Sequence, residues 1–404
     1  MANKKKLHRF FAKIIEKLFT FSGAITGITI LFITIFLFVE GIGLFNSPNT
    51  EEGYGLYINS SNNIENLTPV EIKEIFDGEI TNWKELGGKD SEISPFRIDD
   101  VFQIYPESEF GENYELLPDK LNEVVSKETG IIAFLPLQYA PKGAKVRELP
   151  AESIKISDYF LGKDWIPTAT PSPLFGVLPL VLGTLLVSLV ALIIAVPLGM
   201  GVAIYLSELA GKRQRNILKP AIELLAGIPS VVYGFFGLVV LAPLVQKIFN
   251  LQVGETALTG SIILAIMALP TIISVSEDAM RNTPRSMREA SLALGATKWQ
   301  TIYKVVIPYA KSGISAAVVL GIGRAIGETM AVLMVTGNAA VMPGSIFDSV
   351  RTIPATIAAE LGEAPVGGPH YQALFLLGCI LFIFTSIISV SAEMVSKNKK
   401  YNTH

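Results

Sequence analysis

Two residues of opposite charge, Arg324 and Glu328, lie in an otherwise apolar, small-residue stretch, GIGRAIGETMAVLMVTGN. A charge at the centre of a bilayer costs at least about 2.5 kcal/mol on insertion scales, so such residues are functional candidates by default. An arginine guanidinium presents a fork of N–H donors that suits tetrahedral oxyanions. A nearby carboxylate can hold that arginine or weaken its grip on a passing anion. The two residues therefore indicate a translocation path.

The spacing of this pair allows a second interpretation. Residues at i and i+4 share a helical face, so Arg324 and Glu328 could simply neutralise each other and let the helix insert. Apolar residues would insert more easily, which favours the functional role. Gly323 and Gly327 form a G-x-x-x-G pair that permits close approach of another helix or serves packing alone.

The composition places these residues in a membrane protein. Half of the 404 residues are hydrophobic and the mean hydropathy is +0.46, values that make a soluble enzyme improbable. Crossing the hydrocarbon takes roughly 20 apolar residues. We predict six such spans, at Phe21–Phe45, Leu174–Leu206, Leu224–Val245, Thr256–Ser276, Ser312–Ala340 and Tyr371–Ala392.

The distribution of Lys and Arg predicts the orientation of the spans. Nineteen of them fall in the N-terminus, the segments 212–219 and 281–311, and the tail, whereas the short alternate loops contribute only Lys247 and Arg351. Both termini are therefore expected in the cytoplasm. The segment Glu51–Asp164 holds 23 acidic and 11 basic residues, so its net charge is near −12 and it is expected outside.

Two prolines inside predicted spans are candidates for kinks. Pro229 in AGIPSVVYGFFGL and Pro270 in MALPTII each remove a backbone hydrogen bond. Such breaks produce simple curvature, or hinges in a bundle that alternates between inward-open and outward-open states. The sequence leaves both interpretations open. Pro179 and Pro197 in the second span likewise predict a tilt, a kink or an interfacial start.

The segment RNTPRSMREASLALGATKWQTIYKVVIPYAKSG follows the fourth span. Thr283 is expected to cap a helix with Pro284 at its first position, and Gly295 can end that helix in the left-handed conformation. A second short helix is expected over 298–306, before Pro308. Two short helices at the membrane surface predict a rigid peg for a soluble partner, or an ordinary interfacial loop.

This segment resembles the EAA loop of ABC import permeases, through Glu289-Ala290, Gly295 and Ile307-Pro308. The resemblance implies that Glu289, Ala290 and Gly295 serve contact and geometry in a coupling helix seated on an ATPase subunit. The chain has no G-x-x-x-x-G-K-[ST] loop, so ATP and Mg are expected on that partner, with no catalytic residue, metal or cofactor in this chain. The lone Cys379 cannot form an internal disulfide.

The chain also resembles the phosphate permease family, through the segments GIPSVVYG, GRAIGETMAV and MPGSIFDSV. This resemblance covers about Phe175–Ala392 and is closer to the PstC-type member of the family. This implies a type I, MetI-like importer permease: an all-α polytopic membrane protein of six transmembrane helices with an exterior α/β insert between the first two. The implied partners are a PstA-type permease, two ATPase subunits, an exterior phosphate-binding protein and membrane lipid, without nucleic acid. The implied segments are a cytoplasmic N-terminus at 1–20, the first transmembrane helix at 21–45 and the exterior insert at 46–173. A five-helix permease core at 174–395, which contains the coupling loop 277–311, and a cytoplasmic tail at 396–404 follow.

The segment 46–173 departs from the family, whose corresponding loop is short. LTPVEIKEIFDGEITNWKELGG and ETGIIAFLPLQYAPKGAKV resemble parts of a phosphate-binding protein and predict an amphipathic helix from Thr68-Pro69 to Gly78, then two strands. Such proteins hold the anion with an Arg and a Ser-Gly-Thr element at a helix N-terminus. Arg97 is followed by IDDVFQIYPESEF instead. A docking, gating or structural role is therefore expected rather than phosphate binding.

Three other functions fit parts of the sequence. An ion-coupled secondary transporter or channel could use six spans and an Arg-Glu pair, but it would have no ATPase for the EAA-like loop. An importer of molybdate, sulfate or another oxyanion would share the architecture, although GIPSVVYG and GRAIGETMAV favour phosphate. A sensor of phosphate status is the weakest of the three, because the sequence has no signalling output domain.

Overall fold

The chain divides into two compact units. The computed structural model describes the backbone of residues 2–51, 53–150 and 152–397, and side chains within the range 15–391. The membrane unit comprises Met1–Gly43, Gly183–Asn338 and Ser345–His404. The α/β unit comprises Leu44–Leu182 and Ala339–Gly344. The expected tail at 396–404 lies outside the described residues from position 398 onward.

Six helical segments are long and apolar enough to cross a membrane, as predicted. They are Ile15–Asn46, Leu178–Leu209, Ser230–Phe249, Ala257–Arg281, Lys298–Ile326 and Pro369–Ser391. The α-helices that build the membrane unit are α1 (Ala2–Ile42), α6 (Leu178–Ile204), α7 (Lys212–Ala226), α8 (Ser230–Phe236), α9 (Ala242–Phe249), α10 (Ala257–Arg281), α11 (Arg285–Ala293), α12 (Lys298–Thr301), α13 (Ile307–Ile326), α14 (Met330–Val335), α15 (Ile353–Glu360) and α16 (Pro369–Lys397).

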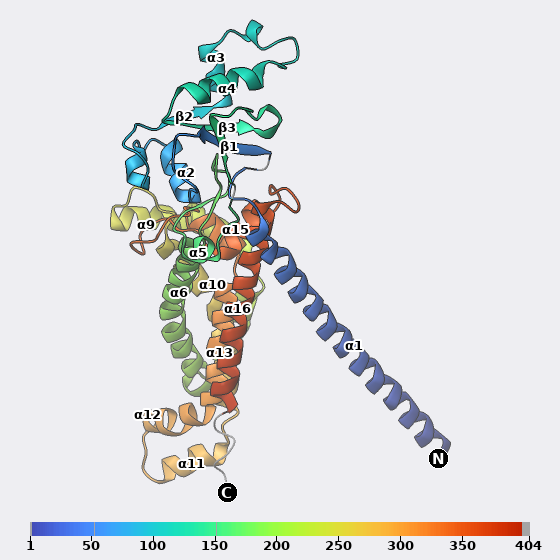
Figure 1. Cartoon of the computed structure of the whole chain (residues 1–404). Helices are drawn as coiled ribbons and strands as arrows, with labels where there is room; N and C mark the ends of the chain where they lie inside the picture. The colour runs from blue at the N-terminus through green and yellow to red at the C-terminus, as the bar shows by residue number, and fades with distance from the viewer. Residues whose placement is uncertain (1, 52, 151, 398–404) are drawn as a thin grey trace. The chain divides into compact units, whose positions relative to one another are not determined.

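Helix α10 lies at the core of the membrane unit. Its apolar window is 61% buried, the largest share among the six spans. It packs closely along α13 (Figure 1). A Cβ added to Gly313 or Gly321 of α13 would lie 2.4 Å from Ala279 or 2.9 Å from Ile272, both on α10. Glycine is therefore required at these two positions for the backbones to approach.

The third and fifth spans differ from the prediction. The chain breaks at Gly227–Pro229, so α7 is a separate helix and the third span begins at Ser230 rather than near Leu224. The fifth span begins at Lys298, because a π-helical segment, Ile302–Val306, joins α12 to α13 without interruption. Its wider turn places Pro308 at the start of α13, where a missing N–H is tolerated.

The α/β unit is built on a four-stranded sheet of order β2-β3-β1-β4. The strands are β1 (Tyr54–Asn59), β2 (Ser94–Arg97), β3 (Ile131–Pro136) and β4 (Val146–Leu149). β1 pairs antiparallel with β3 and β4, and β2 pairs parallel with β3. The two predicted strands, β3 and β4, are present. They do not pair with each other, because β1 lies between them.

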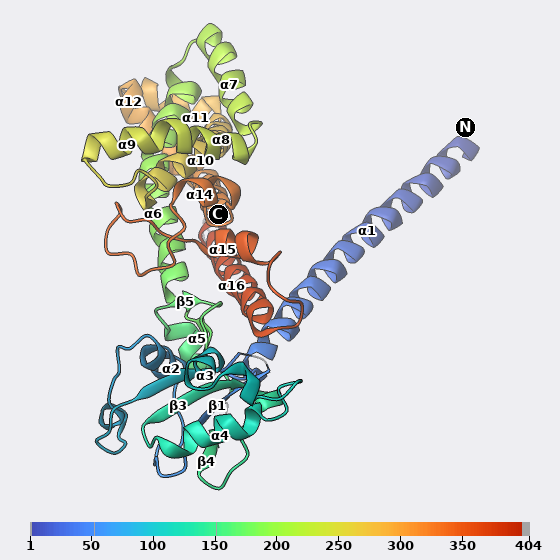
Figure 2. The ribbon, with the colours of Figure 1, turned by 90° about the horizontal axis from the view of Figure 1, so that it is seen from above.

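Alternate side chains of this sheet fill two separate cores. Leu56, Ile58 and Ile132 pack with α2 (Pro69–Phe76) on one face. Tyr57, Ala133 and Leu135 pack with α4 (Leu117–Lys127) on the other. Figure 2 shows α2 and α4 beside the strands. The predicted start of α2 is confirmed, with Thr68 and Glu71 forming a capping box.

The shorter elements of the α/β unit connect these parts. They are α3 (Val101–Ile104), α5 (Ile156–Leu161), β5 (Trp165–Ile166) and β6 (Leu174–Phe175), the last two paired antiparallel. The backbone carbonyls of Tyr159 and Gly162 accept hydrogen bonds from Val177 (2.9 Å) and Leu178 (3.3 Å). All four residues belong to the α/β unit, so these bonds join the end of α5 to residues 177–178 within that unit.

Candidate translocation path and coupling loop

Helices α11 and α12 lie at one end of the membrane unit (Figure 1). The second is not the separate short helix that was expected, because it continues through Ile302–Val306 into α13. Gly295 has φ +82° and ends α11 in the left-handed conformation, as predicted. Glu289, Ala290 and Gly295 are all exposed. The expected cap by Thr283 is wrong, because Pro284 is the N-cap residue and the buried Thr283 hydroxyl has no hydrogen-bond partner in the described structure.

Large apolar and aromatic side chains are exposed around this helix pair, which we call the peg (residues 285–301). Leu294 is 90% exposed and Trp299 is 62% exposed. Met287, Leu292 and, just beyond the peg, Tyr303 are exposed as well. Exposed apolar clusters of this kind mark contact sites for other proteins or for a membrane.

The peg is attached to the rest of the membrane unit by polar contacts. Arg288 bonds to a carboxylate oxygen of Glu208 at 2.8 Å and to the carbonyls of Met280 and Thr283 at 2.9 and 3.0 Å. The Ser291 and Thr301 hydroxyls lie 3.0 Å apart, joining α11 to α12. Arg288 and Glu208 could not be predicted as a pair from the sequence, since no local spacing relates them.

A fully buried carboxylate, Glu277, lies at the end of α10 next to α7. It pairs with Arg215 at 2.9 Å, Lys219 at 2.7 Å and Arg281 at 3.5 Å. Lys219 also reaches Asp278 at 2.9 Å. Burial lowers the pKa of Lys219, but its hydrogen bonds to Glu277 and Asp278 outweigh this, and the pKa lies above its usual value. Only the Glu277–Arg281 spacing could have been read from the sequence.

Arg324 is half-buried near the end of α13. One Nη1 donates to the Thr271 hydroxyl of α10 at 3.4 Å, a long hydrogen bond. Among the described residues Arg324 forms no ion pair. The guanidinium therefore keeps most of its donors available to another group.

Glu328 does not lie on the same helix as Arg324. Helix α13 ends at Ile326, residues 327–329 are not helical, and α14 begins at Met330. A Glu328 carboxylate oxygen instead accepts the backbone N–H of Ala331 at 3.3 Å. The predicted i, i+4 face is therefore wrong, and so is mutual neutralisation on one helix. Non-helical backbone at membrane depth is tolerated where protein or a water-filled cavity satisfies it.

The remaining predicted positions have mixed outcomes. No atom of another described helix lies within 4 Å of a Cβ built at Gly323 or Gly327, although Gly327 lines a groove with residues of α15 and α16. Within the described chain this pair is therefore not used for close helix packing. Pro229 is the N-cap residue of α8 and follows a break between two helices rather than kinking one. Pro270 lies inside the continuous helix α10 and is buried there.

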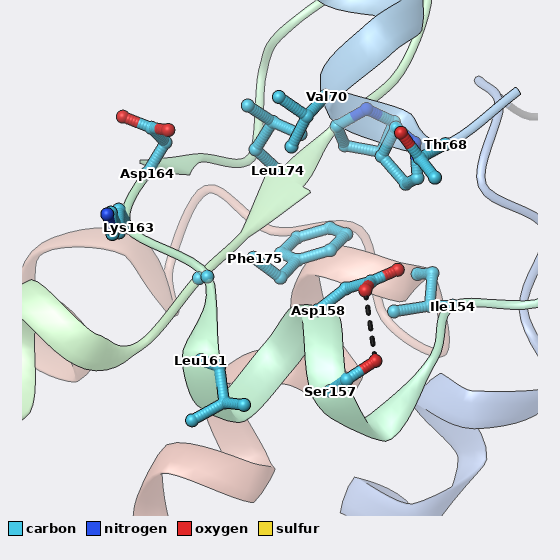
Figure 3. A pocket seen from close by; sticks show the side chains of 14 residues that line it. Thr68, Val70, Ile154, Ser157, Asp158, Leu161, Lys163, Asp164, Leu174 and Phe175 are labelled. Carbon is cyan, nitrogen blue, oxygen red and sulfur yellow. Dashed lines mark hydrogen bonds between the residues drawn. The ribbon is translucent and has the colours of Figure 1, made fainter. Parts of the chain in front are cut away.

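The α/β unit contains a groove of about 310 Å³ between α2, α5 and the β5–β6 hairpin (Figure 3). Val70, Leu161 and Phe175 contribute apolar surface. Asp158 and Asp164 outnumber the one lysine in its lining, so the groove does not favour an anion. Arg97 lies elsewhere, with its guanidinium over the Phe76 ring at 5.3 Å and bonded to Thr170.

The family model described as "Binding-protein-dependent transport system inner membrane component" matches residues 195–400, about half of the chain. The chain belongs to this family. The matched range contains the peg, the Glu277 cluster and Arg324. Membership makes this permease a multi-pass transport subunit, and the predicted fold, a six-span all-α membrane protein carrying an α/β insert, is confirmed.

Curated relatives extend the likeness. The Bacillus subtilis protein named "Probable ABC transporter permease protein YqgH" is 42% identical over 243 residues, 60% of this chain and 78% of that protein. The "Phosphate transport system permease protein PstC" of Mesorhizobium japonicum is 41% identical over 254 residues, 58% of this chain and 76% of that one. A solved chain of the MetNI methionine ABC transporter is 18% identical, with a TM-score of 0.43. The match covers 53% of this chain and 92% of that one. This last likeness is too distant to add to the family match.

Proposed function

We propose that this permease is the PstC-type subunit of an ABC importer that moves inorganic phosphate into the cell. Family membership supports a transport subunit that depends on a binding protein. The relatives named as phosphate transport system permeases support the cargo. The observation that carries the proposal is that Arg324 lies in a membrane-spanning segment and keeps most of its hydrogen-bond donors available.

Arg324 has the properties expected of an anion contact on a translocation path. It lies in a membrane-spanning segment, where a charge without a role would be costly. It bonds only weakly, to Thr271, and its remaining donors suit a tetrahedral oxyanion. Helix α13 ends two residues after Arg324, and Glu328 lies in the non-helical segment 327–329 that follows. In this proposal Arg324 contacts the passing anion and Glu328 limits how tightly it is held.

The proposal includes the other subunits of the importer. The exposed apolar residues of the peg support docking on an ATPase subunit, two of which would bind ATP and Mg, with Glu289, Ala290 and Gly295 providing contact and geometry. The unoccupied face at Gly323 and Gly327 supports close approach of a PstA-type permease. An exterior phosphate-binding protein would deliver the cargo.

The proposed orientation places both termini and the peg in the cytoplasm, within a plasma or inner membrane. It is supported by the distribution of Lys and Arg. The acidic α/β unit then lies outside. Its carboxylate-rich groove and the position of Arg97 support docking or gating for the binding protein rather than phosphate binding.

ATP-dependent uptake of radiolabelled phosphate tests this function. Vesicles would contain this permease with its partner permease, ATPase and binding protein, and sulfate and molybdate would serve as competitors. We expect uptake that only excess phosphate suppresses. Suppression by another oxyanion would keep the importer and change its cargo, and uptake without ATP would support a secondary transporter instead.

A further inference from the structure

The attachment of the peg rests on few side chains. Helix α11 has no buried residue, so apolar packing does not hold it. Among the described residues, the side-chain hydrogen bonds of α11 to the rest of the chain come from Arg288 and Ser291, which lie three positions apart on the same face. Ser291 reaches Thr301 of α12, at the start of the fifth span. Arg288 is the side chain that joins α11 to α6 and α10.

Arg288 makes its contacts in a largely dehydrated position. The side chains of Arg288 and Glu208 are 22% and 10% exposed, and their closest atoms lie 2.8 Å apart. Charge-assisted hydrogen bonds of this kind are short, directional and strong where water is excluded. The guanidinium also donates to the carbonyls of Met280 and Thr283, so one planar group holds α11 to two chain segments, 205–209 and 280–283.

The helices joined in this way cross the whole membrane unit. Glu208 lies in the π-helical segment Tyr205–Leu209 that continues α6, and Met280 lies in the last turn of α10. Helix α10 also carries Thr271, the partner of Arg324. A continuous set of contacts therefore runs from the peg through Arg288 and α10 to the candidate anion contact.

We propose that the Arg288–Glu208 ion pair is the positioning contact that transmits movement of the peg to α6 and α10. This inference rests on the proposed coupling of the peg to an ATPase. Without the pair, the exposed face of the peg still docks, but its movement is no longer passed to the spans. ATP hydrolysis then continues with little transport.

The variants Glu208→Gln and Arg288→Gln test the proposal in the complete importer reconstituted in vesicles. We expect each variant to retain the ATPase subunits and basal hydrolysis, while radiolabelled phosphate taken up per ATP hydrolysed falls about tenfold. Because Arg288→Gln already breaks the pair that Glu208→Gln removes, the double variant is expected to be no worse than Arg288→Gln alone. Arg288→Lys keeps the charge but loses the planar fork, and an intermediate ratio is expected.

A matched control is Arg213→Gln, which removes an exposed arginine of α7 on the same side of the membrane unit. Its uptake per ATP is expected to equal that of the unchanged permease. A second measurement, amide hydrogen exchange of the permease alone, is expected to show faster exchange in α11 in both test variants, with α10 unchanged.

Several outcomes would overturn the inference. Unchanged uptake per ATP in Glu208→Gln would show that the Arg288–Glu208 pair does not transmit movement. Additive losses of uptake per ATP in the double variant would show the same. Loss of the ATPase subunits from Glu208→Gln would show that the pair only shapes the docking face. If the unchanged importer moves sulfate or molybdate instead of phosphate, the proposed cargo is wrong. The amount of that anion taken up per ATP hydrolysed then tests the Arg288–Glu208 pair in the same way.

Discussion

Arg324 is the residue on which the proposed transport chemistry depends. Replacing it with Gln removes the charge and most of the donor fork while keeping a polar side chain. Since a hydrogen bond to a charged group contributes about 1.5–3 kcal/mol, we expect uptake to fall at least about tenfold. The measurement is vesicle uptake alongside recovery of the ATPase subunits. Undiminished uptake with an intact complex would remove Arg324 from the path.

Glu277 is a residue whose role is structural. Three cations surround its buried carboxylate, so Glu277→Gln would leave Arg215, Lys219 and Arg281 without their shared counter-charge. Breaking a buried ion pair from one side costs about 3–5 kcal/mol. We expect a clear fall in the thermal unfolding temperature of the detergent-solubilised permease. The control is Glu223→Gln on α7, where an exposed carboxylate forms no ion pair with any described residue, and this variant should unfold like the unchanged chain.

Gly295 tests the geometry of the peg. At φ +82° an alanine is strained by about 1–2 kcal/mol, although no atom lies within 4 Å of where its Cβ would be. We expect Gly295→Ala to weaken retention of the ATPase subunits on purification. Asn adopts this conformation more readily, so Gly295→Asn should retain more of them. Equal retention of the ATPase subunits in both variants would mean that the backbone conformation at residue 295 does not determine the geometry of the peg.

At the level of elements, carboxylates of the α/β unit predict acid sensitivity. Hydrogen bonds lower the pKa of Glu115 (from backbone N–H groups), Glu123 (from Lys127) and Glu152 (from Lys155, then Asn66) below the usual 4.5. A carboxyl group with a lowered folded-state pKa stabilises the fold above its unfolded-state pKa and loses that effect as the pH falls through the folded value.

We therefore expect the contribution of these three carboxylates to the stability of the α/β unit to be present above about pH 4.5 and to be lost progressively below it. Amide hydrogen exchange of α4 and β4 in the full chain, measured from pH 7 to pH 3.5 after correction for intrinsic rates, follows this loss. Exchange in the buried helix α10 serves as the internal control. Protection of α4 that rises on acidification would contradict the prediction.

Local signals in the sequence predicted many elements correctly. Apolar length identified six spans, the Thr68-Pro69 helix start located α2, and Gly295 marked the end of α11. The end of α13 at Ile326 was missed, because residues 327–335 remain apolar enough to continue a helix and hydropathy does not detect a break. β1 and β2 were missed because their neighbours are distant in sequence.

The candidate site was predicted only in part for a related reason. Arg324, Glu328 and the peg stood out by charge or motif within one short segment. Glu208, Arg288 and the Glu277 cluster depend on partners about 60 to 80 positions away. A single sequence holds no local pattern for such pairs. The same limit led to the incorrect expectation that Arg324 and Glu328 share a helical face.

For the whole molecule, the orientation of the chain can be measured with cysteines. The one native cysteine, Cys379, is buried, so it should react little and can be replaced by Ala. In that background we expect Asn113→Cys in the α/β unit to react with a membrane-impermeant maleimide in intact cells. Ser286→Cys on the peg should react only after the membrane is opened. The reverse pattern would invert the proposed topology.

The strand order of the α/β unit has a consequence for synthesis. β1 is the first strand made, yet its two neighbours are β3 and β4, so Leu56 meets Phe134 on one side and Leu149 on the other. Contacts between such distant positions form late and slowly. As the chain leaves the ribosome, α1 can enter the bilayer long before β1 finds a neighbour. We therefore expect the sheet to assemble on a chain that is already tethered to the membrane.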